Sequence, residues 1–470
     1  MLWLGAFSWI WLCVLGAVLL LVILSMLFLH YMRRIIVERD LNYDGEDKKD
    51  IPLSQRFMAR VIPVLRIGHS KVTAWWYGHP SDKIKLVGVT GTNGKTTIAT
   101  VLYELFRKMG HRCGLISTVS VYIDDKEMPA VITTPGAVEL NRLMSKMVKA
   151  GCEYVFMECS SHGLVHKRIN GLHFSGAIFT NLTRDHLDYH RTFENYRNAK
   201  KSFFDMLPLH AFALINADDE NSSIMVRDCK ATVKTYSIDQ KADFMVAVVS
   251  QDINGMQLKI NGREVKTRLL GRFNAINLLA VYGAAVMLGK KPDEILAVMP
   301  EMKSVRGRLD PVRLPNDIFA FVDYAHSPDA LRNVLTAIHE VIDSGARVVT
   351  VCGAGGNRDK GKRPMMALEA VKQSDHVILT SDNPRFENPQ DIINDMLTGL
   401  DSLQKEHVTC VVNRREAIRQ ACLMARKGDV VLVAGKGHEE YQEIKGERQH
   451  FSDHEVLCEL ITPIASNKKT

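Results

Sequence analysis

The stretch Gly88-Val-Thr-Gly-Thr-Asn-Gly-Lys-Thr-Thr97 decides the fold, because it follows a buried apolar run and opens a helical pattern. Glycines let backbone N–H groups approach phosphate oxygens, and the start of the following helix adds a favourable dipole. A lysine here reaches the β- and γ-phosphates, and a threonine hydroxyl can ligate Mg²⁺. The sequence therefore predicts a nucleotide site built from Gly91, Thr92, Asn93, Gly94, Lys95, Thr96 and Thr97.

One position departs from the strict phosphate-loop pattern. Val89 stands five residues before Gly94, where the pattern has glycine. A plain tight turn would also use these glycines. Such a turn gives no reason for a lysine and two threonines to crowd the start of a helix, so nucleotide binding is the favoured interpretation.

Strands and helices alternate outward from this loop. Strands are expected over 85–90, 154–157, 177–179 and 211–215, with a helix over 98–109. A second set begins near Arg308, with strands over 318–322, 347–352, 377–380 and 430–434 and a helix over 329–342. This alternation predicts two α/β domains with parallel sheets, a central P-loop-type ATPase domain over 83–305 and a Rossmann-like doubly wound domain over 306–470.

The N-terminal region is different in character. Residues 2–29 contain no charged side chain, and about 20 apolar residues suffice to cross a bilayer. Arg33 and Arg34 follow at once, which places the rest of the chain in the cytoplasm by the positive-inside rule. The sequence thus predicts a single-pass anchor (1–30) in the cytoplasmic membrane, with a cleaved signal or an interfacial hairpin as alternatives. Residues 31–82 would be a juxtamembrane segment and linker, with a short amphipathic helix over 53–67 around Pro63.

Composition narrows the function classes. The net charge of +7 on 470 residues is a mild excess, and no basic run is interleaved with aromatic residues, so nucleic-acid binding has little support. The nine cysteines form no Cys-x-x-Cys pair, which argues against a disulfide framework or a zinc ribbon.

Eight further motifs follow the loop and carry a family resemblance. They are Glu158-Cys-Ser-Ser-His-Gly-Leu, Thr180-Asn-Leu-Thr-Arg-Asp-His-Leu-Asp-Tyr-His, Gly271-Arg-Phe-Asn-Ala-Ile-Asn, Gly307-Arg-Leu with Val322-Asp-Tyr-Ala-His-Ser-Pro, Gly355-Gly-Asn-Arg-Asp-Lys-Gly-Lys-Arg-Pro, Asp382-Asn-Pro-Arg and Ala434-Gly-Lys-Gly-His-Glu. Together with the loop they resemble, from about Tyr77 to the C-terminus, the Mur ligase family, and within it the branch that adds meso-diaminopimelate to a muramoyl peptide.

Glu158 and His186 also have a chemical interpretation of their own. Both are expected just past strand ends on the nucleotide side, where a carboxylate and an imidazole can hold Mg²⁺ against the phosphates. The resemblance adds Thr96 and Lys200 to these metal-site residues. It implies that Lys200 is a carbamate bridging to a second Mg²⁺, whereas the sequence alone would make Lys200 a solvated helix residue.

The resemblance also implies the reaction and its residues. ATP would contact Asn277, Arg308 and Asp323, with His326 in the same loop, and Lys95, Lys200, His186 and Arg308 would be catalytic. The acceptor carboxylate would take the γ-phosphoryl group of ATP to give an acyl phosphate and ADP. The amine of the amino acid would then displace phosphate and form an amide.

Two substrate sites follow from the same resemblance. The amino acid would contact Arg358, Asp382, Asn383, Pro384, Arg385, Gly435 and Glu439, with Arg385 on its far carboxylate and Glu439 on its far ammonium. The acceptor peptide would contact Thr133, Thr134, Ser160, His166 and Arg168. Ile132 and His166 stand where the family has Asn and Gln, and the usual uridine-diphosphate-binding domain is expected to be replaced by the anchor.

Alternatives remain open at this point. They are the same chemistry on a non-uridine or membrane-linked acceptor, a folylpolyglutamate-synthetase-like ligase, a P-loop NTPase that drives movement or signalling, and a catalytically dead scaffold. Intact Lys95, Glu158, His186 and Lys200 disfavour the scaffold, and Asp382-Asn-Pro-Arg disfavours the folate enzyme. The oligomeric state is left undecided.

Overall fold

The computed structural model describes residues 53–461, and the chain divides into two compact units, 1–64 and 65–470. Helix α2 (Leu53–Trp76) begins in the first unit and continues into the second. The helix expected over 53–67 therefore begins where predicted but ends nine residues later, with Pro63 inside it. Its second half is fixed by a contact that no local pattern shows, since the Ser70 hydroxyl donates a hydrogen bond to the Lys167 carbonyl (2.7 Å).

The predicted single-pass membrane localisation needs correction. Within residues 53–461, no helix is both long enough and apolar enough to span a bilayer. Helix α2 has the length, at 24 residues, but it contains Arg56, Arg60, Arg66 and Lys71. The apolar run over 2–29, on which the prediction rested, lies outside the described residues. A membrane anchor in place of a nucleotide-binding domain is accordingly not supported.

The first sheet is mixed, not wholly parallel as expected. Its strand order is β11-β10-β9-β8-β7-β6-β1-β5-β2-β3-β4. The strands are β1 (Lys85–Thr90), β2 (Cys113–Ile116), β3 (Ser120–Ile123), β4 (Lys126–Pro129), β5 (Tyr154–Glu158), β6 (Gly176–Phe179), β7 (Phe212–Asn216), β8 (Thr232–Ser237), β9 (Phe244–Asp252), β10 (Gly255–Ile260) and β11 (Arg263–Thr267). The central strands are parallel, whereas β2-β3-β4 and β9-β10-β11 are antiparallel extensions at the two edges, joined by short turns.

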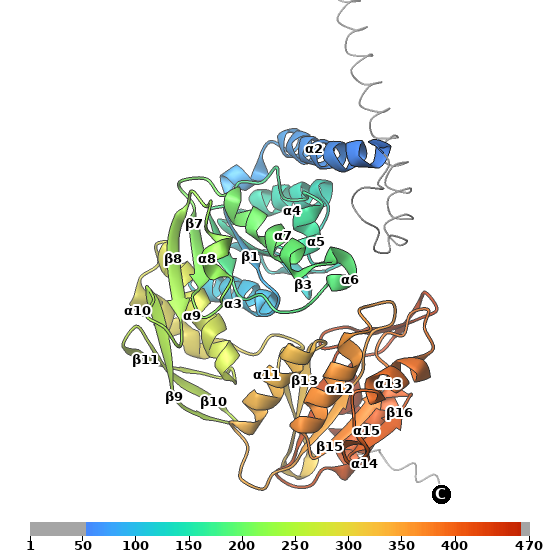
Figure 1. Ribbon diagram of the computed structural model, residues 1–470. Helices are drawn as coiled ribbons and strands as arrows, with labels where there is room; N and C mark the ends of the chain where they lie inside the picture. Colours follow the sequence, from blue (N-terminus) through green and yellow to red (C-terminus); the bar gives the residue numbers. More distant parts are fainter. Residues whose placement is uncertain (1–52, 462–470) are drawn as a thin grey trace, which may run out of the picture. The chain divides into compact units, whose positions relative to one another are not determined.

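Helices cover both faces of this sheet (Figure 1). They are α3 (Lys95–Lys108), α4 (Ala137–Lys149), α5 (Ser161–Val165), α6 (Leu187–His190), α7 (Phe193–Asp205), α8 (Ser222–Met225), α9 (Arg272–Met287) and α10 (Pro292–Val298). Helices α3 and α9 pack with Val87, Val89 and Phe156 in one core, and α4 and α7 pack with Leu86 and Val155 in the other. The side chains of β1 and β5 thus alternate between two buried faces, which explains their nearly continuous apolar sequence.

The second sheet has the order β12-β13-β17-β14-β15-β16. It contains β12 (Asp310–Leu314), β13 (Ile318–Asp323), β14 (Val348–Cys352), β15 (His376–Thr380), β16 (Val408–Val411) and β17 (Val430–Ala434). Only β12 is antiparallel among these six, so the expected doubly wound sheet is present with one antiparallel edge.

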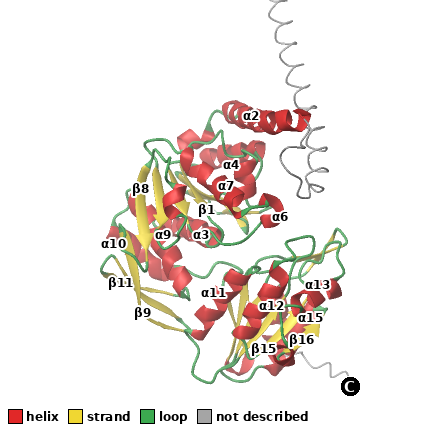
Figure 2. Ribbon diagram, viewed as in Figure 1, coloured by secondary structure: helices red, strands yellow, loops and turns green. Residues whose placement is uncertain are grey.

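Helices again lie on both faces of this sheet (Figure 2). Helices α11 (Pro328–His339), α12 (Lys362–Lys372) and α13 (Pro389–Leu397) pack on one core, and α15 (Arg414–Met424) and α16 (Asp453–Ile461) pack on the other. Helix α14 (Ser402–Glu406) precedes β16, and a hairpin of β18 (Tyr441–Ile444) and β19 (Glu447–His450) follows β17. The loops after β13, β14, β15 and β17 leave the same edge of the sheet, which is where ligands bind in this architecture.

Candidate functional site

The phosphate loop joins β1 to α3, and its glycines are required by close approach. Gly91 has φ +148°, and a Cβ there would lie 1.8 Å from the Thr180 hydroxyl. Gly94 has φ +86°, and a Cβ there would lie 2.6 Å from Oδ1 of Asn277. The segment after β6 also holds the loop in place, because the Asn93 N–H donates a hydrogen bond to the Asn181 side chain (2.9 Å). The helix predicted from residue 98 begins earlier, at Lys95, directly at the loop.

Two lysines, the partly buried Lys95 and the fully buried Lys200, converge on one carbonyl of this loop. Lys95 Nζ donates to the carbonyls of Gly91 (2.9 Å) and Thr92 (2.6 Å), and Lys200 Nζ donates to the same Gly91 carbonyl (2.7 Å). Burial lowers the pKa of both amines, and for Lys200 the charge of Lys95 lowers it further. Asp185 acts on both amines and Glu158 on Lys95, but burial outweighs these charges, an arrangement that favours an incoming phosphate or a neutral Lys200 amine.

Glu158 ends β5 beside the loop and is almost fully buried. Its carboxylate accepts hydrogen bonds from the backbone N–H of Thr118 (2.7 Å) and from the Thr118 hydroxyl (3.1 Å). The charge of Glu158 also raises the pKa of Lys95, against the effect of burial. A buried carboxylate close to a threonine-rich loop supplies the hard oxygen atoms that Mg²⁺ prefers, so the donor chemistry fits this cation.

His186 follows β6 and adopts φ +55°. Its Nε2 lies 3.4 Å from the Asp185 carboxylate, and Nε2 of His326 lies 3.9 Å from the same oxygen. Burial lowers the pKa of His186 to about 3, so its ring is neutral and can ligate a metal through nitrogen. Burial alone would raise the pKa of Asp185, but the charge of Lys362 and the backbone N–H of His186 (2.9 Å) hold it well below its usual range.

The structure does not bring the expected metal ligands into one ready cluster. In the described part of the chain, no three His, Cys, Asp or Glu side chains are grouped so that they could hold a metal. Thr96 and Lys200 take part in other contacts, since the Thr96 hydroxyl accepts a bond from Arg308 (3.1 Å) and Lys200 binds Gly91.

The predicted acceptor residues form a connected group next to Glu158. Thr134 donates through its hydroxyl to the Glu158 carbonyl (2.8 Å) and accepts from the Ser160 N–H (2.9 Å). The Arg168 guanidinium donates to the Thr134 carbonyl (2.7 Å), and Thr133 joins the group through the Thr118 hydroxyl (3.1 Å). His166 shares a hydrogen bond with Tyr189 (3.1 Å).

The predicted nucleotide residues of the second sheet lie around β13. Arg308 reaches Thr96 in α3 and stacks on the Tyr324 ring, with 4.4 Å between the guanidinium carbon and the ring centroid. Asp323 ends β13 and accepts the backbone N–H groups of Leu309 (2.5 Å) and Ala325 (2.7 Å). Burial raises the pKa of Asp323 to about 6.

The predicted amino-acid residues gather at the loops after β14, β15 and β17. Asn383 donates to Oε2 of Glu439 (2.7 Å), and Arg385 donates to the Gly356 carbonyl (2.7 Å) from a backbone at φ +52°. Gly435 is required at φ +116°, because a Cβ there would lie 2.6 Å from an Asp382 oxygen. Arg358 is half-exposed and lies 3.8 Å from the Asp188 carboxylate.

Four residues near these groups were not singled out from the sequence: Thr118, Asp185, Lys362 and Lys436. Asp185 directly precedes His186, and both lysines lie inside the quoted motifs. Their positions in the sequence could therefore have marked them as site residues. Thr118 had no such signal, since it lies in a loop between β2 and β3. Burial lowers the pKa of Lys362, which Asp185, Asp382, Asp188 and Asp359 surround.

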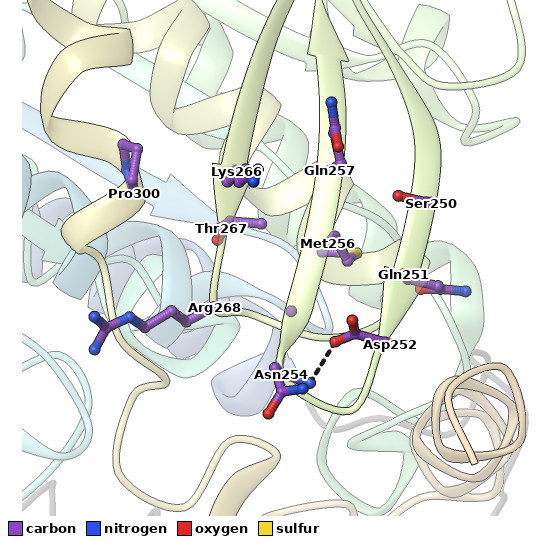
Figure 3. Close-up of a pocket in the computed structure, with 11 residues that line it drawn as sticks. Ser250, Gln251, Asp252, Asn254, Met256, Gln257, Lys266, Thr267, Arg268 and Pro300 are labelled. Carbon is purple, nitrogen blue, oxygen red and sulfur yellow. Dashed lines mark hydrogen bonds between the residues drawn. The ribbon is translucent and has the colours of Figure 1, made fainter. Parts of the chain in front are cut away.

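A cavity of about 430 Å³ lies elsewhere, on the antiparallel strands β9, β10 and β11 (Figure 3). Its lining includes Gln251, Gln257, Lys266 and Arg268, and none of the predicted site residues is among them. The predicted residues instead occupy loops at the carboxyl ends of parallel strands, where this class of fold binds ligands.

Comparisons with known proteins agree with this arrangement. The Mur ligase middle domain model matches residues 89–285, and the Mur ligase, glutamate ligase domain model matches residues 307–437. The chain is 60% identical over 387 residues to the UDP-N-acetylmuramoyl-L-alanyl-D-glutamate–2,6-diaminopimelate ligase of Parabacteroides distasonis, covering 82% of this chain and 80% of that protein.

Solved structures show the same relationship. A structure of a ligase with that same name is 34% identical, with a TM-score of 0.59, and covers 84% of this chain and 82% of its own. A folylpolyglutamate synthase from Mycobacterium tuberculosis has a TM-score of 0.65 at 17% identity, covering 79% of this chain and 93% of its own, which shows a shared fold alone.

Proposed function

Because the chain belongs to the Mur ligase family, we propose that it is an ATP-dependent, ADP-forming ligase that joins 2,6-diaminopimelate to UDP-N-acetylmuramoyl-L-alanyl-D-glutamate. The observation that carries the proposal is the 60% identity over 387 residues to a ligase of that name. The site geometry is compatible with it, since the phosphate loop, the polar acceptor group and the predicted amino-acid residues all lie on loops at the ends of strands.

We propose that residues 83–305 form the ATP-binding domain and residues 306–470 the amino-acid-binding domain. Lys95 neutralises the transferred phosphoryl group, and Arg308 approaches the same loop from the second domain. Thr133, Thr134, Ser160, His166 and Arg168 hold the acceptor peptide. Asn277 and Asp323 position the nucleotide, and Gly91 and Gly94 keep its phosphates close to the backbone.

For the metal site, we propose that Thr96, Glu158 and His186 hold Mg²⁺, which would neutralise phosphate charge when bound. The support is the buried Glu158 carboxylate and the neutral ring of His186. We further propose that Lys200 is carbamylated and serves a second Mg²⁺. Its lowered pKa supports this, because only a neutral amine reacts with CO₂.

For the amino acid, we propose that Arg358 and Arg385 bind carboxylates and that Glu439 binds the far ammonium. Asn383 supports Glu439, and Asp382, Pro384 and Gly435 shape the pocket. A zwitterionic end requires both an anion and a cation as partners, and the loops after β14, β15 and β17 supply them.

The direct test measures ADP and phosphate release by the purified protein over pairs of acceptors and amino acids. The proposal expects turnover with UDP-N-acetylmuramoyl-L-alanyl-D-glutamate and meso-diaminopimelate, and much less when L-lysine replaces the latter. Turnover only with a folate acceptor and glutamate would favour the folylpolyglutamate synthetase alternative. ADP release that needs no acceptor would favour a simple NTPase.

We predict that Lys95→Ala loses about 1000-fold or more in kcat, because it removes a charge that balances the transferring phosphoryl group. The matched control is Lys108→Ala, which removes an exposed lysine at the far end of the same helix. Both variants are assayed for ADP release at saturating substrates. Near-normal turnover by Lys95→Ala would reject the assignment of the phosphate loop.

A further inference from the structure

Lys436 lies in the loop after β17, and its side chain is fully buried. Its ammonium donates hydrogen bonds to Oδ1 of Asn383 (3.1 Å) and to Oε2 of Glu439 (3.1 Å), and it lies 5.4 Å from the centroid of the Tyr441 ring. A buried ammonium is costly unless it is paired, so these contacts indicate a fixed position for Lys436.

Glu439 pairs with this lysine and, unlike it, reaches the surface. Its Oε2 accepts both the Lys436 bond and the Asn383 bond (2.7 Å), while its side chain remains 15% exposed. The carboxylate is therefore held from behind through one oxygen. The exposed part of this carboxylate is available to an incoming cation.

The charges around Glu439 make Lys436 its main nearby cation. Burial raises the pKa of Glu439 and the neighbouring Asp382 raises it further, whereas Lys436 lowers it. Asp382 itself has a lowered pKa despite its burial, because Lys436, Arg414 and His326 act on it. The guanidinium of Arg414 forms its ion pair with Asp453, a buried pair (2.7 Å), and not with Asp382 or Glu439.

Two tyrosines also lie near Glu439, Tyr324 with Arg308 and His438 beside it and Tyr441 with Arg448 and Arg385 beside it. Burial raises the pKa of Tyr324 and of Tyr441, and the charge of Glu439 contributes to both shifts, so both phenols stay neutral near neutral pH. Loss of Lys436 would leave Glu439 and Asp382 as neighbouring buried acids, and one of them would take up a proton.

We infer that Lys436 is a positioning residue for the amino-acid site, which keeps Glu439 anionic and oriented to receive the ammonium of the incoming amino acid. This inference rests on the proposed function, in which Glu439 binds that ammonium. Lys436 does not bind the substrate itself, because its side chain has no exposed surface and both of its hydrogen bonds go to protein oxygens.

The kinetic test compares the wild type with Lys436→Gln, which keeps a donor without the charge, and with Lys436→Arg, which keeps the charge. Lys427→Met, which removes an exposed lysine of the same domain, is the matched control. For Lys436→Gln we expect KM for meso-diaminopimelate to rise by up to about tenfold on the acid limb of the pH profile, where one unit of pKa counts in full, and by less near pH 7, with kcat and the KM for ATP nearly unchanged. Lys436→Arg should recover most of the loss.

The sign of the pH effect follows from the raised pKa of Glu439. Binding of the ammonium needs the anionic carboxylate, so kcat/KM for the amino acid falls as pH falls through that pKa. Without the lysine charge the pKa moves up, and the acid limb of the profile should shift to higher pH by about one unit. A Lys436→Gln profile that coincides with the wild-type profile would overturn the inference, as would an equal loss in kcat alone.

A second measurement separates this inference from the proposed function. Infrared difference spectra of Lys436→Gln against wild type need no substrate, and we expect a new protonated-carboxyl band that disappears in the Lys436→Gln, Glu439→Gln double variant. A band of this kind with no turnover of any diamino acid would support the inference about Lys436 and reject the proposed substrate. Absence of the band in a folded variant would reject the inference.

Discussion

At the scale of single residues, Lys200 and its neighbour Lys201 form a natural comparison. Lys200 is buried against the Gly91 carbonyl with a lowered pKa, whereas Lys201 is paired with Asp205 and Asp228 and its pKa is raised. Carbamylation needs a neutral amine, so only Lys200 is expected to react with CO₂. We predict that Lys200→Ala lowers kcat about 100-fold and that Lys201→Ala does not.

The same chemistry predicts a dependence on dissolved CO₂. Wild-type turnover should fall in buffer stripped of CO₂ and recover on addition of bicarbonate, while Lys200→Ala should not respond. Assays of ADP release with and without bicarbonate measure this directly. If neither the substitution nor bicarbonate changes the rate, Lys200 has no catalytic part.

At the scale of the element, the turn between β1 and α3 depends on Gly91. A side chain at this position would strain the backbone and would also collide with a neighbouring residue. Gly91→Ala would place a Cβ 1.8 Å from the Thr180 hydroxyl at φ +148°. We predict a loss of about 2 kcal/mol or more in the free energy of unfolding, together with loss of ATP binding. Urea unfolding and nucleotide titration measure the two effects.

Gly110→Ala is the control for this prediction. Gly110 follows the other end of α3 at φ +88°, and a Cβ there meets nothing within 4 Å. Its cost should be confined to backbone strain, about 1 kcal/mol, with ATP binding unchanged. Equal effects of the two substitutions would show that the close approach at Gly91 has no special role.

At the scale of the whole molecule, catalysis requires that the two sheets bring their loops together. Arg308 belongs to the segment before β12, yet its guanidinium donates to Thr96 at the start of α3. We predict that Arg308→Ala lowers kcat about 100-fold, as expected for removal of one charged donor from a phosphoryl-transfer site. The control is Arg313→Ala, because Arg313 pairs with Asp317 at the surface of the same domain (3.3 Å).

The result for Arg308→Ala shows whether the Arg308 contact is catalytic or only structural. Loss of kcat with an unchanged melting temperature would support a direct role for Arg308 at the phosphates. A lowered melting temperature with normal kcat at low temperature would instead make Arg308 a structural contact between the two sheets.

The sequence by itself determined the features that depend on neighbouring residues. Glycines, a lysine and threonines at fixed spacing encode the phosphate loop, and the apolar runs over 85–90 and 430–434 encode buried strands, because nearest neighbours set turn geometry and burial period. The α/β class was confirmed on this basis. The local pattern was less informative at the edges of the first sheet, where β3 and β10 run antiparallel to both of their neighbours and make the sheet mixed.

Only the tertiary structure decided which distant groups meet. Lys200 reaches the carbonyl of Gly91 across 109 positions of sequence, and Lys436 reaches Asn383 across 53. Helix α2 continues past Pro63 to Trp76, where Ser70 holds it to the Lys167 carbonyl. These contacts depend on the order of strands in each sheet and on burial, which sets the protonation of the lysines. Neither the strand order nor the burial of a side chain can be read from spacing along the chain. The lowered pKa of Lys200 and the contact of Lys436 with Glu439 were therefore visible only in the folded protein.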